Sequence, residues 1–174
     1  MHRDDTRSTA QRRPALYTPQ ERQRRDNTRW TLVQGLLAPV QFLIFGISLY
    51  LVINSLKTGE HTDWALASVV LKTVVLYAIM VTGAIWEKVV FGQYLFAPAF
   101  YWEDVVSMGV LALHTAYLWV WWQGLWGATD QLLLALAAYV SYGINAAQYI
   151  RKLRMARLQK PSTSLPTSGA QAST

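Results

Sequence analysis

Four long stretches of mostly apolar residues alternate with short polar segments along this chain. The apolar stretches cover about residues 30–56, 64–86, 104–126 and 132–150. At about 1.5 Å of rise per residue, each is long enough to cross a bilayer as a helix. The pattern predicts an all-α integral membrane bundle of four transmembrane helices, with an aromatic interfacial loop between the second and third.

The segments outside these stretches predict a short helix and two tails. Residues 1–17 are polar and unpatterned, and residues 159–174 are rich in Pro, Ser, Thr and Gly, so both are expected to be disordered. Thr18 and Glu21 have the spacing of a capping box, with Pro19 at the first helical position. Residues 18–29 should therefore form a short helix, whose polar faces place it among lipid headgroups. The transmembrane domain is expected over residues 30–158.

The basic residues indicate how the bundle is oriented. Of the 16 Lys and Arg, eight precede Trp30 and five follow Ile150, which leaves Lys57, Lys72 and Lys88 between them. Basic groups that flank apolar spans are orientation signals, so we expect no nucleic-acid partner. Four crossings place both termini on one side, and the positive-inside rule makes that side the cytoplasm.

Composition excludes several kinds of site. There is no cysteine, so disulfides, thiolate nucleophiles and iron–sulfur clusters are excluded. No Gly-rich phosphate loop, dinucleotide fingerprint or HExxH motif is present. His2 and His61 lie outside the spans, so a haem held by histidines on facing helices is not expected. We predict neither a bound metal nor a cofactor.

The candidate chemistry lies in residues 86–104. This stretch carries four ionisable groups, Glu87, Lys88, Glu103 and Asp104, among apolar and aromatic side chains. A loop this apolar should lie at the bilayer interface or partly enter the bilayer. Carboxylic acids among aromatic rings tend to hold a proton, which suits an acid catalyst. The alternative is that these residues are ordinary interfacial anchors.

Polar residues in two of the spans would lack hydrogen-bond partners if they faced lipid. Glu103, Ser107 and His114 fall within about 40° of one another around the third helix. A histidine hydrogen-bonded to a neighbouring helix is the competing interpretation. Lys72, inside the second span, must find a carboxylate, a hydroxyl, an anion or a water-filled cavity, or lose its proton. It could instead extend to the interface.

A third polar stripe lies on the first span. Gln34, Gln41 and Ser48 are spaced by seven residues and so share one face. Amides that faced lipid would lack hydrogen-bond partners, so this stripe should face the bundle interior. Hydrogen bonding between helices is its expected role.

Four segments together resemble a known family. They are RWTLVQG (29–35), IWEKVVFGQYLFAPAFYWED (85–104), LHTAY (113–117) and KLRMAR (152–157). They closely resemble the 3-vinyl bacteriochlorophyllide hydratase family, over about residues 16–158. The resemblance implies a multi-pass enzyme of the bacterial inner membrane that acts in bacteriochlorophyll biosynthesis. It would add water to the C3 vinyl group of chlorophyllide a or a related chlorin, giving a 1-hydroxyethyl group.

The implied partners are a chlorophyllide-type tetrapyrrole that brings its own magnesium, water, membrane lipid and neighbouring pigment-biosynthesis enzymes. Vinyl hydration needs an acid to protonate the terminal carbon and a base to orient water. We expect Glu87 or Glu103 to be the acid, and Asp104 and His114 to position or deprotonate the water. His114 could instead ligate the substrate magnesium. The candidate substrate-binding residues are Lys72, Trp86, Lys88, Phe96, Phe100, Trp102 and Ser107.

Two other classes of function compete with a hydratase. A non-catalytic tetrapyrrole-binding or photosystem-assembly protein would use the aromatic residues and the histidine but not the carboxylates. A small transporter would explain Lys72, although no inverted repeat is visible.

Overall fold

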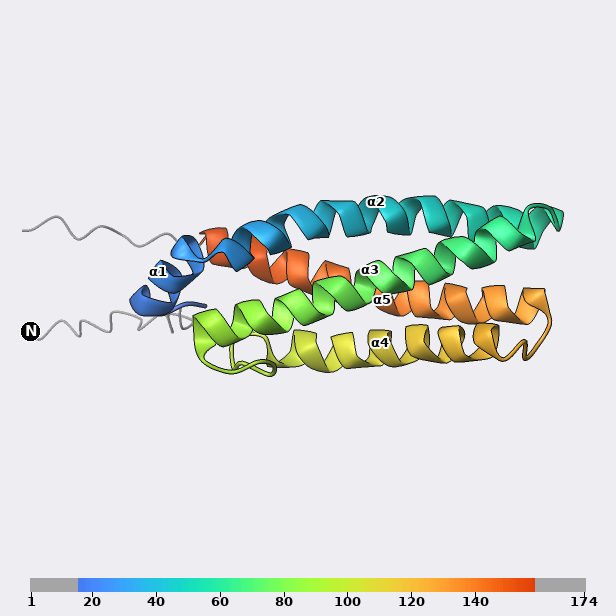
Figure 1. Cartoon of the computed structure of the whole chain (residues 1–174). Coiled ribbons are helices and arrows are strands. Elements are labelled where there is room, and N and C mark those ends of the chain that lie inside the picture. The colour runs from blue at the N-terminus through green and yellow to red at the C-terminus, as the bar shows by residue number, and fades with distance from the viewer. Residues whose placement is uncertain (1–15, 159–174) are drawn as a thin grey trace, which may run out of the picture.

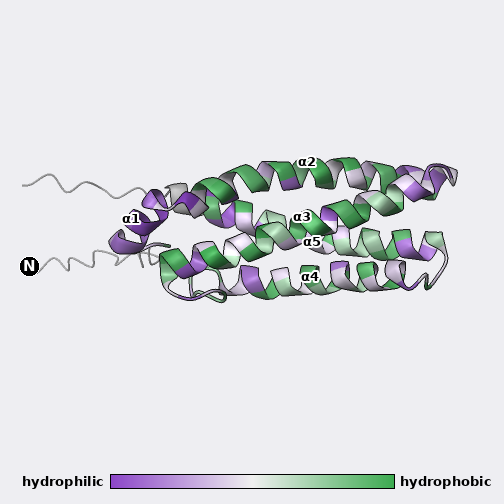
Figure 2. Ribbon diagram, viewed as in Figure 1, coloured by the Kyte–Doolittle hydropathy of each residue, from purple (hydrophilic) through white to green (hydrophobic). Residues whose placement is uncertain are grey.

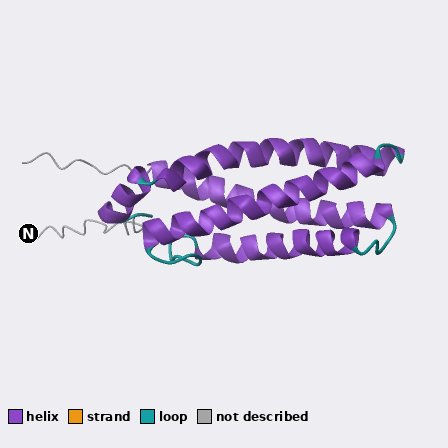
Figure 3. Ribbon diagram, viewed as in Figure 1, coloured by secondary structure: helices purple, strands orange, loops and turns teal. Residues whose placement is uncertain are grey.

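The computed structural model describes residues 16–158, and side chains up to residue 155. This part of the chain is all α-helical, as predicted (Figure 1, Figure 3). The tails expected to be disordered lie outside it, except for Leu16 and Tyr17. The helices are α1 (Pro19–Asn27), α2 (Arg29–Thr58), α3 (Thr62–Phe91), α4 (Tyr101–Trp122) and α5 (Ala128–Leu158).

Helices α2 to α5 run side by side and alternate in direction (Figure 1). Helix α2 packs mainly on α3, and α4 mainly on α5, so the bundle consists of two antiparallel hairpins. We call the interface between the α2–α3 hairpin and the α4–α5 hairpin the seam. Helix α1, the 92–100 loop and the last turns of α5 lie together at one end of the bundle, which we call the acidic end.

The outer surface of the bundle suits lipid better than water. Helices α2, α3 and α4 are long and apolar enough to cross a membrane. Large apolar side chains such as Leu32, Leu36 and Leu43 point outward, whereas Gln41 and Lys72 are buried. Apolar residues dominate the middle of the bundle, and polar residues gather at its ends (Figure 2). This distribution is the one that a membrane-spanning bundle requires.

Capping residues set the first helix boundaries. The side-chain oxygen of Thr18 accepts a hydrogen bond from the Glu21 N–H at 3.2 Å, and the Glu21 carboxylate accepts one from the Thr18 N–H at 2.7 Å. The predicted capping box is confirmed. Gly59 directly follows α2 and ends it. Its φ of 73° is left-handed, a conformation that only glycine adopts at little steric cost.

The loop between the second and third spans is shorter than predicted. Glu87 was expected to begin it, but α3 continues to Phe91 and α4 begins at Tyr101. No glycine or proline lies between Trp86 and Gly92, whose φ of 88° ends α3. Glu87 therefore lies on a helix, and only residues 92–100 form the loop.

Tyr17 fastens α1 to the acidic end. Its ring is buried and stacks on Phe91, with centroids 5.7 Å apart, while the Arg25 guanidinium lies 4.8 Å from its centroid. Burial raises the pKa of the Tyr17 hydroxyl despite the nearby positive charge of Arg25. The end of the segment expected to be disordered is thus packed against α3.

We predict that Tyr17→Ala releases α1 from the bundle. The variant loses the apolar contact with Phe91, of order 2 kcal/mol, so trypsin should cut after Arg22 or Arg25 about tenfold faster. Limited proteolysis in detergent micelles measures this rate. Tyr50→Ala is the matched control, because Tyr50 is exposed on α2. Equal cleavage rates in both variants would contradict the docking role.

Candidate active site

Two buried carboxyl groups meet where α3 ends and α4 begins. Glu87 is 5% exposed and Asp104 is 2% exposed, and their carboxyl groups lie close to each other. Two negative charges so close together and so far from water are unfavourable, so the pair is best accommodated with one proton. We call Glu87 and Asp104 the acid pair. Its geometry is that of two carboxyl groups sharing one proton.

The 92–100 loop covers the acid pair with its backbone. The Phe96 N–H donates to Asp104 Oδ2 at 2.7 Å, and the Ala97 N–H donates to Glu87 Oε2 at 3.4 Å. Phe96 has a φ of 60°, a left-handed conformation that costs a non-glycine residue about 1 kcal/mol. The strained loop is held closed by the carboxyl groups that it covers.

A chain of hydrogen bonds runs from the acid pair into the bundle. The Tyr149 hydroxyl donates to Asp104 Oδ1 at 3.1 Å, and the Ser107 hydroxyl lies beside that of Tyr149. The Asn145 amide donates to the Ser107 oxygen at 2.8 Å. A Ser107 hydroxyl that donates to Tyr149 would align every donor in this chain toward Asp104. Aligned donors reinforce one another and favour negative charge on the final acceptor.

Glu103 has a different partner from the other two acids. Its carboxylate forms an ion pair with Lys152 of α5, with Nζ and Oε2 2.5 Å apart. The Lys152 ammonium also lies 5.0 Å from the Phe100 ring centroid. This ion pair gives Glu103 a partner on α5, so it is engaged separately from the acid pair.

Deeper in the bundle, Lys72 and His114 form a second buried cluster. The His114 Nδ1–H donates to the Val110 carbonyl at 2.8 Å, so Nε2 accepts from Lys72 Nζ at 3.0 Å. The Lys72 nitrogen also lies 3.7 Å from the centroid of the Tyr142 ring. Lys72 is fully buried and does not extend to the interface.

His114 faces the bundle interior, as expected, and so do Glu103 and Ser107. It follows Asp104 by ten residues, which is about 15 Å along α4. Both of its ring nitrogens are engaged, one by Val110 and one by Lys72. The structure thus places His114 in a cluster of its own, apart from the acid pair.

Two of the four aromatic residues expected to bind substrate form a wall beside the acid pair. Phe100 is buried and stacks on Tyr149, with centroids 5.9 Å apart. The Trp86 indole N–H donates to Thr31 Oγ1 at 2.9 Å, and its ring packs edge-on against Phe100. These rings position the loop and the end of α5.

The other two aromatic residues expected to bind substrate, and Lys88, lie at the surface, whereas the expected Lys72 and Ser107 are buried. Trp102 is 70% exposed and Phe96 is 38% exposed, so both rings are accessible to a flat apolar ligand. The Lys88 ammonium donates to the Gly92 carbonyl at 2.8 Å and lies 5.3 Å from the Tyr94 ring centroid. Lys88 thus closes the end of α3 and stays near the loop.

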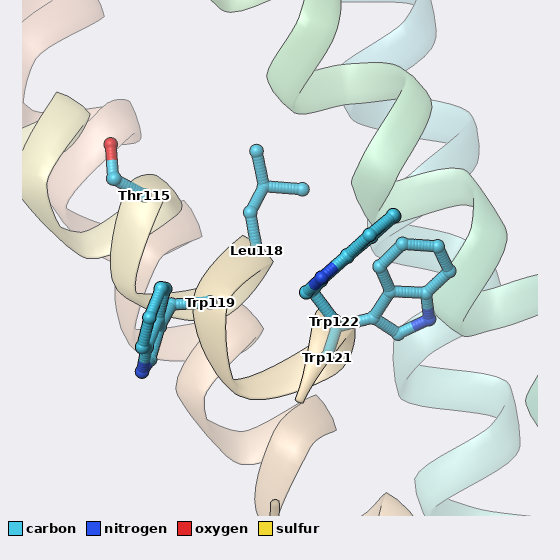
Figure 4. Close-up of a pocket in the computed structure, with 5 residues that line it drawn as sticks. All are labelled: Thr115, Leu118, Trp119, Trp121 and Trp122. Atoms are coloured by element: carbon cyan, nitrogen blue, oxygen red, sulfur yellow. The ribbon is translucent and has the colours of Figure 1, made fainter. Parts of the chain in front are cut away.

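Hollows at the opposite end of the bundle are far from the acids. One of about 310 Å³ is lined by Thr115, Leu118, Trp119, Trp121 and Trp122 (Figure 4). Another, of about 430 Å³, is lined by Trp126, Asp130, Leu133 and Leu134. These tryptophans suit an aromatic belt at the membrane surface. Neither hollow is lined by the acid pair, which the backbone of the 92–100 loop covers.

Three site residues on α5 were not among those predicted from the sequence. Asn145, Tyr149 and Lys152 are spaced by four and three residues, so they share one helical face. That spacing was the available signal. It does not reveal that this face meets the first turn of α4.

The family of the chain follows from comparison with known proteins. A family model described as 2-vinyl bacteriochlorophyllide hydratase matches residues 17–155. The chain belongs to this family. The resemblance noted in the sequence is confirmed. No solved structure matches the chain.

Two curated relatives carry the family's name. The 2-vinyl bacteriochlorophyllide hydratase of Rhodobacter capsulatus is 63% identical over 150 residues, which cover 86% of this chain and 87% of the relative. That of Cereibacter sphaeroides is 66% identical over 143 residues, or 82% of this chain and 89% of the relative. The similarity therefore spans the acid pair, the loop and α5.

We predict that the Lys152–Glu103 ion pair stabilises the acidic end. Lys152→Met leaves the Glu103 carboxylate nearly buried without its partner and should lower the free energy of unfolding by about 1–3 kcal/mol. The double variant Lys152→Met/Glu103→Met removes both charges and should regain part of that loss. Unfolding by denaturant in detergent micelles measures both values. Strictly additive losses would contradict a coupled pair.

Proposed function

We propose that this protein hydrates the vinyl group of a bacteriochlorophyllide-type pigment in bacteriochlorophyll biosynthesis. This is the group that the family name numbers 2 and that current tetrapyrrole numbering calls C3. The reaction converts –CH=CH₂ and water into –CH(OH)–CH₃, so the enzyme is a hydro-lyase. Family membership supports the reaction. The buried Glu87 and Asp104 carboxyl groups, which lie close together beneath the 92–100 loop, are the structural observation that supports the mechanism.

In this mechanism Glu87 is the acid and Asp104 is the base. The Glu87 proton moves to the terminal vinyl carbon, and positive charge develops on the inner carbon and spreads into the macrocycle. Water then attacks the inner carbon and gives its proton to Asp104. Transfer of that proton along the hydrogen bond to Glu87 restores the pair. The ionised carboxylates also stabilise the cation.

The hydrogen bonds support this division of roles. Asp104 accepts from the Phe96 N–H and from the Tyr149 hydroxyl, and both favour its ionised form. Glu87 accepts only the longer bond from Ala97, so it is the partner that holds the proton. Glu103 is engaged in the ion pair with Lys152 and is therefore not assigned the role of proton donor. Asp104 is a better base than His114, whose ring nitrogens are both engaged.

The pigment reaches the acid pair when the 92–100 loop opens. Opening costs two backbone hydrogen bonds but relieves the left-handed strain at Phe96. The exposed rings of Phe96 and Trp102 then offer flat apolar surfaces for the macrocycle. Lys88 or Arg151, both at this end of the bundle, would bind its propionate.

Substitution of the acid pair gives the direct test. Glu87→Gln keeps the shape but removes the transferable proton, so the hydration rate should fall by about 100-fold or more. Membranes are incubated with chlorophyllide a. Product mass is followed, together with the red absorption band, which moves to shorter wavelength when the vinyl group leaves the conjugated system.

Glu103→Gln is the matched control on the neighbouring carboxylate, because its amide oxygen can still accept from Lys152. It should keep the rate within about tenfold of the unsubstituted protein. An unchanged rate in Glu87→Gln would remove that residue from the mechanism. Pigment binding without conversion by the unsubstituted protein would instead favour the non-catalytic role.

We further propose that α5 is the fourth crossing and that the acidic end faces the cytoplasm of the bacterial inner membrane. Helix α5 lies along α4 for most of its length (Figure 1), and basic residues follow Ile150. The loop then lies at the cytoplasmic interface, where neighbouring pigment-biosynthesis enzymes could deliver or take up the pigment.

Single cysteines test this topology, because the chain has none of its own. We predict that Glu60→Cys and Gln123→Cys react with a membrane-impermeant thiol reagent added outside spheroplasts. Gln93→Cys and Met155→Cys should react only after the membrane is opened. All four positions are exposed at helix ends or in loops. Labelling of Met155→Cys from outside would mean that α5 does not cross.

A further inference from the structure

The seam contains buried amides that no helix satisfies. Gln41 of α2 is 1% exposed, and neither of its amide atoms has a hydrogen-bond partner of good geometry among the described residues. The side-chain oxygen of Asn145 on α5 is likewise buried without a described partner. An unsatisfied amide in an apolar interior costs on the order of 2 kcal/mol or more. Native structures satisfy such groups with internal water.

The two orphaned amides border the same polar region. Gln41 lies beside the Tyr142 hydroxyl, and the Tyr142 ring packs on Phe45 of α2, with centroids 4.8 Å apart. The Lys72 ammonium also lies over this ring. Asn145 follows Tyr142 by about one helical turn on the buried face of α5. Residues from both hairpins therefore line this part of the seam.

We propose that Gln41, Tyr142 and Asn145 form an internal water site that supplies the hydration reaction. Gln41 offers one donor group and one acceptor, Asn145 offers an acceptor and the Tyr142 hydroxyl offers either. A bound water needs two to four such partners. The supply role rests on the proposed function, whereas the water site itself does not.

A row of neighbouring polar groups connects the site to the acid pair. Asn145 donates to Ser107, the Ser107 hydroxyl lies beside that of Tyr149, and Tyr149 donates to Asp104. Tyr142 precedes Tyr149 by seven residues, so the water site lies about 10 Å deeper than the acid pair. Water that enters along these groups reaches the base without opening the loop to bulk solvent.

Radiolytic hydroxyl-radical footprinting of the full chain in lipid nanodiscs tests for the water itself. Radicals formed from bound internal water label the side chains beside it even when bulk solvent is excluded. Tyr142, which is 7% exposed, should be labelled several-fold more than Tyr117, which is fully buried and donates its hydroxyl to the Leu66 carbonyl. Equal, low labelling of the two tyrosines in the unsubstituted protein would overturn the proposal without requiring any variant.

Substitution of Gln41 tests the supply role. Gln41→Leu should lower Tyr142 labelling about fivefold and the hydration rate about tenfold. Gln34→Leu is the matched control, because Gln34 lies seven residues before Gln41 on the same face of α2 and its amide donates to Thr82. It should change neither the labelling nor the rate. Loss of the label with an unchanged rate would overturn the supply role. Glu87→Gln should keep the label, so a failure of the acid mechanism would be distinguished from a failure of the water site.

Discussion

A polar group inside a bilayer has no solvent to satisfy it, and this constraint organises the whole bundle. The charged and amide side chains of the middle of the chain turn inward and meet at the seam and the acidic end. Lys72 finds His114 and an aromatic ring, and Glu103 finds Lys152. The outer surface is left to large apolar residues. Buried polar side chains consequently lie next to apolar core residues such as Val52 and Val69, while the outer surface is apolar.

The same constraint gives the acid pair its chemistry. Two carboxyl groups removed from water cannot both stay charged so close together, so they share a proton. In the proposed mechanism, the donors that end on Asp104 keep the charge there and leave the proton with Glu87. In water these groups would be two independent carboxylates. In the proposal, burial makes them an acid and a base held in contact.

Periodicity within a helix could be predicted from the sequence, but contacts between helices could not. The spacing of Gln41 and Ser48, and that of Ser107 and His114, correctly gave their inward faces. The capping box of α1 was equally clear. The pairing of His114 with Lys72 depends on the relative rotation and depth of two helices, which no local pattern encodes. The contacts that Asn145, Tyr149 and Lys152 of α5 make with α4 could not be predicted for the same reason. The sequence predicts too short an α3, because residues typical of a bilayer interface also suit the start of a loop.

Vinyl hydration makes two demands that conflict at first sight. The protonated acid and the cation that it creates are best kept from bulk water, yet one water molecule must reach the inner carbon. The 92–100 loop meets the first demand, because Phe96 and Ala97 close over the carboxyl groups on the side from which the pigment would enter. A water held deeper in the seam would meet the second, since it approaches from the opposite side. Pigment and water would then reach the acid pair by separate routes, and the loop could stay closed over the macrocycle during the reaction.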